Sequence, residues 1–106
     1  MKIAQRIQND RMRVAVLGGA AKNSIGIDPE SEEFFDTVSS LVIQGLGVEI
    51  NEKNDGPDSS RWVGELNGVS IYFEYDDMIG TTICVDLLAS GSSKVVDNLV
   101  GLLNTF

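Results

Sequence analysis

Carboxylates in two turn-forming segments are the residues of this sequence that could do chemistry. Asp55 and Asp58 lie in the first segment, and Asp76 and Asp77 lie in the second. If the two turns met at one end of a sheet, these side chains could bind Ca²⁺ or Mg²⁺, or act as acid and base. Neither segment has the glycine and closing glutamate of a calcium loop. We therefore expect no metal there, and an enzyme that uses Asp76 and Asp77 is the least favoured alternative.

Other catalytic designs are restricted by what the chain contains. It has no histidine, so the commonest general base and the Ser-His and Cys-His pairs are excluded. Cys84 is the only cysteine, it lies in an apolar strand-like segment, and it has no basic neighbour in sequence, which predicts a structural thiol. Gly18 and Gly19 lack the later glycines of a dinucleotide site. We expect a protein that is not an enzyme and has no cofactor.

The net charge of −8 is divided unevenly along the chain. Residues 1–22 hold five basic side chains and one acid, whereas residues 23–106 hold three basic side chains and fifteen acids. An acidic body repels phosphate backbones, so the sequence favours a basic protein partner over a nucleic acid. The alternative is that the acids only keep a small protein soluble.

The N-terminal segment has basic residues before a short apolar run, which is the order of a secretion signal. Asp10 and two glycines interrupt that pattern. The apolar runs are far shorter than the roughly 20 residues that cross a bilayer. A single cysteine also fits a reducing compartment. We expect a cytoplasmic protein that is not inserted in a membrane.

Length and composition predict one domain, residues 1–106, with an uncertain basic segment at 1–27. Within that segment Ile3, Ile7 and Val14 fit a loose helical stripe, but a strand could equally begin near residue 13. We favour a short helix followed by a strand.

Two further helices are predicted from capping residues and apolar spacing. Asp28 is a good N-cap and Pro29 suits the first helical position, so we expect a helix over residues 29–44. Ser92 or Ser93 could cap a C-terminal helix with one apolar face.

The clearest local signal is Asn67-Gly68, which is typical of a type I′ turn and predicts a hairpin over residues 60–75. Alternating residues near 48–51 and 81–88 add two strands. Four strands between helices indicate an α+β fold, an antiparallel β-meander of about four strands with helices packed on one face.

An outward hairpin face with aromatic and charged side chains is the predicted binding surface. The turn register places Tyr72 beside Arg61 and Glu74, whereas Trp62 is predicted to lie in the core. Aromatic anchors among carboxylates suit recognition of a basic protein. The residues expected to contact a partner are Glu52, Asp55, Asp58, Arg61, Tyr72, Glu74, Asp76 and Asp77.

In size, acidity, lack of catalytic residues and helix-flanked meander, the chain resembles the small acidic immunity proteins of bacterial toxin–immunity systems, including contact-dependent growth inhibition. This resemblance implies that the protein neutralises a cognate toxin, often a basic nuclease, by direct binding. It implies toxin contacts by Glu52, Asp55, Asp58, Glu74, Asp76 and Asp77. The basic side chains among the first 22 residues do not fit an inhibitor that binds its toxin through acidic side chains alone. The alternative is an acidic secretion-chaperone-like or other homodimeric adaptor.

Overall fold

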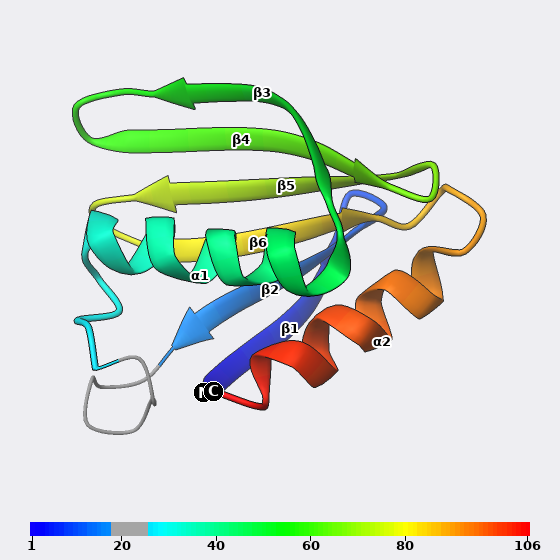
Figure 1. The fold of residues 1–106 in the computed structure, drawn as a ribbon, viewed down its shortest axis with the longest axis horizontal. Coiled ribbons are helices and arrows are strands. Elements are labelled where there is room, and N and C mark those ends of the chain that lie inside the picture. Colours follow the sequence, from blue (N-terminus) through cyan, green and yellow to red (C-terminus); the bar gives the residue numbers. More distant parts are fainter. Residues whose placement is uncertain (18–25) are drawn as a thin grey trace.

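The computed structural model describes residues 1–17 and 26–106 and has an α+β fold, as predicted (Figure 1). Its elements in chain order are β1 (Lys2–Gln8), β2 (Arg11–Leu17), α1 (Glu32–Leu46), β3 (Glu49–Asp55), β4 (Ser59–Leu66), β5 (Val69–Asp76), β6 (Gly80–Asp86) and α2 (Ser92–Leu103). The strands form one antiparallel sheet in the order β1-β2-β6-β5-β4-β3, and both helices cover the same face of it (Figure 1).

The meander predicted from the sequence corresponds to β3 to β6, but the sheet is larger because the N-terminal segment is a hairpin. The predicted short helix is wrong: β1 and β2 are joined by Asn9 and Asp10, whose φ values are 53° and 59°. Both residue types tolerate the left-handed region, as a tight hairpin turn requires. Ile3 and Ile7 are four residues apart, a spacing that shares one face in a strand as well as in a helix. Gly18 and Gly19, which were compared above with a dinucleotide site, lie outside the described residues.

The central hairpin has the predicted register. Trp62 pairs with Phe73 and Arg61 pairs with Glu74 across β4 and β5. Asn67 and Gly68 have φ values of 52° and 80°, as a type I′ turn requires.

Helix α1 begins three residues later than predicted, because Ser31 and not Asp28 is its N-cap. The Ser31 hydroxyl accepts a hydrogen bond from the Phe34 N–H at 3.1 Å. The Asp28 carboxylate instead accepts the Glu30 N–H at 3.0 Å, in a turn that precedes the helix. At the other end, Gly47 adopts the left-handed conformation with a φ of 77°.

Helix α2 also differs from the prediction at its start. Gly91 is the N-cap and supplies no side-chain hydrogen bond. Ser92 is the first helical residue, and its hydroxyl donates to the carbonyl of Leu87 at 3.2 Å. The predicted serine cap is therefore wrong, and Ser92 instead ties the helix to the chain that leaves β6.

The core lies between the helices and the sheet. Its largest fully buried side chains come from α1, α2 and the two central strands, β5 and β6: Phe34, Phe35, Ile71, Phe73, Ile83, Leu99 and Leu103. Trp62 is 5% exposed and packs edge-on against Phe35, with ring centroids 4.9 Å apart, so its predicted place in the core is confirmed. Neither helix of the described chain is long and apolar enough to pass through a membrane.

Candidate functional site

The sheet face opposite the helices is not covered by any described element, and we call it the open face. Antiparallel pairing arranges its side chains in rows that cross all six strands. The central row is Arg6, Arg13, Cys84, Tyr72, Val63 and Glu52. One flanking row is Ala4, Ala15, Thr82, Glu74, Arg61 and Asn54. The other joins Gln8, Arg11 and Asp86 on β1, β2 and β6, and continues the register of β6 and β5 by one residue to Ser70, Glu65 and Glu49. Arginines therefore occupy β1 and β2, whereas β3 and β4 carry three glutamates and Arg61.

Tyr72 lies at the centre of the open face between two guanidinium groups. The Arg11 guanidinium is 4.2 Å from the centroid of its ring, and that of Arg61 is 5.1 Å away. Both distances are within the range of cation–π attraction. Arg61 also places its Nε 3.9 Å from a carboxylate oxygen of Glu74, a weak surface ion pair. The predicted cluster of Arg61, Tyr72 and Glu74 is thus present in the structure.

Cys84 lies beneath this cluster and is fully buried. Its thiol donates to a carboxylate oxygen of Glu74 at 3.4 Å. Burial, and then the negative charge of Glu74, raise the pKa of the Cys84 thiol to about 11. The thiol is therefore protonated at neutral pH, and a protonated thiol is a poor nucleophile.

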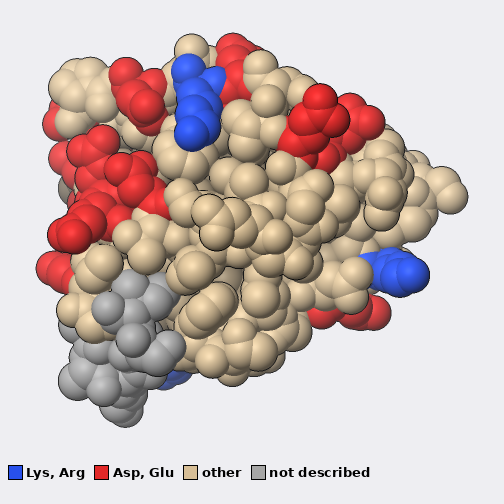
Figure 2. Space-filling model, viewed as in Figure 1, with Lys and Arg blue, Asp and Glu red and all other residues tan. Residues whose placement is uncertain are grey.

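Carboxylates from three segments converge where α1 begins and the β3–β4 and β5–β6 turns lie (Figure 2). We call this surface the acidic end; its members are Asp28, Glu30, Glu32, Asp58, Asp76 and Asp77. The Asp77 N–H donates to the Asp58 carbonyl at 3.1 Å, which joins the two turns. The Tyr75 hydroxyl donates to the Glu30 carbonyl at 3.2 Å and ties the third segment to the sheet.

The pKa of Tyr75 is raised by desolvation and in part by the negative charge of the acidic end. Desolvation raises the pKa of its phenol first, and the carboxylates of Asp77 and Glu32 then raise it further. The same carboxylates would attract a basic group placed there, since each sign of charge stabilises its opposite.

Two apolar side chains project from the acidic end. Met78 and Ile79, in the β5–β6 turn, are 90% and 71% exposed. The Asp76 carboxylate holds this turn by accepting the Met78 N–H at 2.8 Å. In this segment Asp76 and Asp77 were predicted as contact residues but Met78 and Ile79 were not, although two large apolar residues among turn formers are the signal that could have revealed them.

The structure divides the eight predicted contact residues among three places. Glu52, Arg61, Tyr72 and Glu74 lie on the open face, Asp58, Asp76 and Asp77 lie at the acidic end, and Asp55 lies on the helix side of β3. The Asp55 carboxylate accepts the indole N–H of Trp62 at 3.0 Å, and this hydrogen bond is the main reason that the pKa of Asp55 is lowered. Asp55 thus anchors a core tryptophan.

Arginines of the N-terminal hairpin are the functional candidates that the sequence analysis missed. Arg11 and Arg13 face the open side because they alternate with Met12 and Val14, which face the helices. This two-residue alternation could have identified the strand and placed both arginines on one face.

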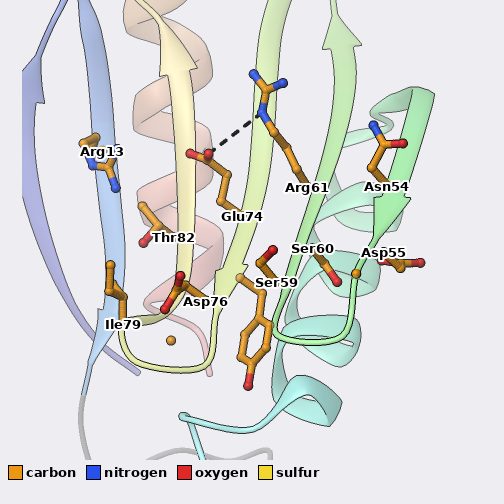
Figure 3. A pocket seen from close by; sticks show the side chains of 13 residues that line it. Arg13, Asn54, Asp55, Ser59, Ser60, Arg61, Glu74, Asp76, Ile79 and Thr82 are labelled. Carbon is orange, nitrogen blue, oxygen red and sulfur yellow. Dashed lines mark ion pairs between the residues drawn. The ribbon is translucent and has the colours of Figure 1, made fainter.

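A hollow of about 580 Å³ lies on the open face beside the β5–β6 turn (Figure 3). Arg13 and Arg61 lie on opposite sides of it, and Glu74 and Thr82 lie between them. Because positive and negative side chains both line the hollow, it favours neither a simple anion nor a simple cation. Over residues 1–17 and 26–106, no three histidine, cysteine, aspartate or glutamate side chains are arranged so that they could hold one metal ion.

These features define a six-stranded α+β domain with a charged open sheet face and a separate acidic end. No protein-family model matches the chain, and no curated protein matches its sequence.

Proposed function

We propose that this protein is a non-catalytic inhibitor of the immunity-protein type, which binds a basic toxin through its acidic end. The observation that carries the proposal is the exposed pair Met78 and Ile79 set among the carboxylates of that end. Stable interfaces commonly have apolar anchors at the centre and charged groups at the rim. The sequence-level resemblance to immunity proteins supports the same choice of partner.

Electrostatics explains why a basic partner fits this surface. The carboxylates at the acidic end come from separate segments, and hydrogen bonds to backbone atoms hold these segments together, so the negative charges are gathered before a partner arrives. A preorganised negative patch accelerates encounter with a positive protein and disfavours acidic or neutral competitors. A nuclease toxin has the required charge, because its active site must attract phosphate.

The acidic end supplies direct tests of this proposal. The tagged protein would be purified with the product of its neighbouring gene at low and high salt. We expect a one-to-one complex that weakens with salt and that protects cells from the partner. Asp58→Lys combined with Asp77→Lys should weaken binding by about tenfold or more, since it replaces attraction by repulsion at the rim. Met78→Ala should weaken it by a similar factor if Met78 is an anchor.

Asp97→Lys is the matched control. Asp97 is exposed on α2, away from the acidic end, and the substitution makes the same change in charge as Asp58→Lys or Asp77→Lys alone, against which it is compared. Equal weakening by Asp97→Lys would indicate an effect of net charge alone. Retention of full affinity by the Asp58 and Asp77 double variant and by Met78→Ala would rule out the acidic end as the toxin-binding surface.

A further inference from the structure

We infer that the open face binds the open face of a second copy of this chain and forms a two-fold symmetric dimer. Asp58, Asp77 and Met78 do not line the hollow on this face, although Ile79 borders it at the end of the strands. The inference is argued from residues along the strands and does not depend on toxin binding. In a two-fold interface, each surface must be complementary to itself. The open face meets this condition because its β1–β2 half carries Arg6, Arg11 and Arg13 and its β3–β4 half carries mainly glutamates. Arg61 is the one arginine in the β3–β4 half, and about the axis described below it falls opposite Ala15 of the other copy.

The charge pattern selects the direction of the symmetry axis. An axis parallel to the strands, between the central strands β5 and β6, places β1 of one copy over β3 of the other and β2 over β4. An axis in the interface plane but perpendicular to the strands places β1 over β1. Arg6 would then face the arginines of an identical hairpin, which is unfavourable. The parallel axis is therefore the one that the charges support.

The rows of the open face match when they are turned about this axis. Arg6 of one copy falls opposite Glu52 of the other, and Arg11 falls opposite Glu65. Cys84 falls opposite Tyr72 at the centre. None of the three rows defined above brings two like charges directly opposite each other.

The composition and size of the open face also suit a dimer. Its centre holds half-buried Tyr72 and Val63 beside small or buried residues, whereas its exposed charges lie toward the edge strands. Six strands about 4.8 Å apart and seven residues long, at about 3.3 Å per residue, give a face of roughly 670 Å². This is close to the roughly 800 Å² per partner of a standard interface. Two such faces pack with their strands nearly aligned, as the proposed axis requires.

A charge swap tests the pairing of Arg6 with Glu52. The mass of the wild-type protein in solution, measured by light scattering and sedimentation, should be that of a dimer. Arg6→Glu and Glu52→Arg should each raise the dissociation constant by about tenfold or more, because symmetry turns two favourable pairs into two repulsive ones. The double variant R6E/E52R should recover most of the affinity, since both pairs reform with reversed sign.

Lys94→Glu on α2 is the matched control and should leave the dimer unchanged, because Lys94 is exposed on the helix side. Both open-face substitutions lie at exposed positions on edge strands, and circular dichroism would verify that each variant is folded. A wild-type protein that stays monomeric at its highest soluble concentration would overturn the inference. So would a dimer that is indifferent to both single variants, or one that the double variant fails to restore. Dimerisation is also what the secretion-chaperone-like alternative requires, and the toxin-binding assays above distinguish the two.

Discussion

Gly64 gives the sharpest test of how the sheet is packed. It faces the core from β4, paired with Ile50 of β3 and Ile71 of β5. A Cβ atom at this position would lie 2.7 Å from Cγ1 of Val48 and 3.0 Å from the carbonyl oxygen of Glu49. Such distances are well inside van der Waals contact, and one of the two neighbours is backbone. The space that a side chain at position 64 would need is already filled by Val48.

We therefore expect Gly64→Ala to destabilise the fold. Overpacking a core position costs about 1–3 kcal/mol, and alanine recovers about 0.5–1 kcal/mol of backbone entropy in a strand interior. The net loss should be about 1–2 kcal/mol, which lowers the urea midpoint by roughly 0.5–1 M for a small domain. Urea unfolding followed by Trp62 fluorescence and by circular dichroism would measure it, since Trp62 is buried against Phe35.

Two further variants separate packing from backbone effects. Gly101→Ala in α2 meets nothing within 4 Å, so it should stabilise the protein by about 0.5–1 kcal/mol through helix propensity alone. Val48→Ala removes the nearest colliding atom, so Val48→Ala combined with Gly64→Ala should cost less than the sum of the single variants. If Gly64→Ala is as stable as the wild type, or if the two changes are additive, the packing explanation is refuted.

Three further predictions concern local interactions. Ser31→Ala should cost about 1 kcal/mol by removing the cap of α1, whereas Asp28→Ala should cost less; equal losses in urea titrations would contradict the assignment of the cap. The Trp62 hydrogen bond lowers the pKa of Asp55 below its ordinary value of 3.8, so the stability it contributes is present above pH 3.8 and is lost as the pH falls through the folded-state pKa. Asp55→Asn should reduce the fall of the melting temperature at acid pH, whereas the exposed Asp36→Asn should not. Cys84, with a pKa of about 11 and no exposure, should react with a thiol reagent at mildly alkaline pH only after unfolding; rapid labelling of the native protein would disprove this.

The sequence was most informative where turn chemistry and side-chain pattern agree. Asn67-Gly68 joins two strongly alternating strands, so both the hairpin and its register could be predicted. Asn9-Asp10 forms the same kind of turn, but β1 is an edge strand that buries little. Its polar exposed residues leave only Ile3 and Ile7 as a pattern, and their spacing fits either period. Edge strands are therefore harder to recognise than central ones.

The candidate surfaces depended on contacts that a sequence pattern does not contain. The cluster of Arg61, Tyr72 and Glu74 followed from one hairpin register and could be predicted. The acidic end required two turns to meet, which the hydrogen bond from Asp77 to Asp58 establishes. Asp55 looked equivalent to Asp58 in sequence, yet strand β3 extends to it and turns its carboxylate toward Trp62.

The uneven charge along the chain becomes an uneven charge across the sheet. Because β1 and β2 pair with each other and then with β6, the basic N-terminal residues are confined to one side of the open face. Glu49, Glu52 and Glu65 lie on β3 and β4 at the opposite side, and the central strands β6 and β5 separate them from the arginines. If basic and acidic residues were mixed along the chain, the face would not separate positive charge on one side from negative charge on the other. The order of charges in the chain, combined with the strand order, is therefore sufficient to make this surface complementary to itself, and this is the property that the charge-swap experiment measures.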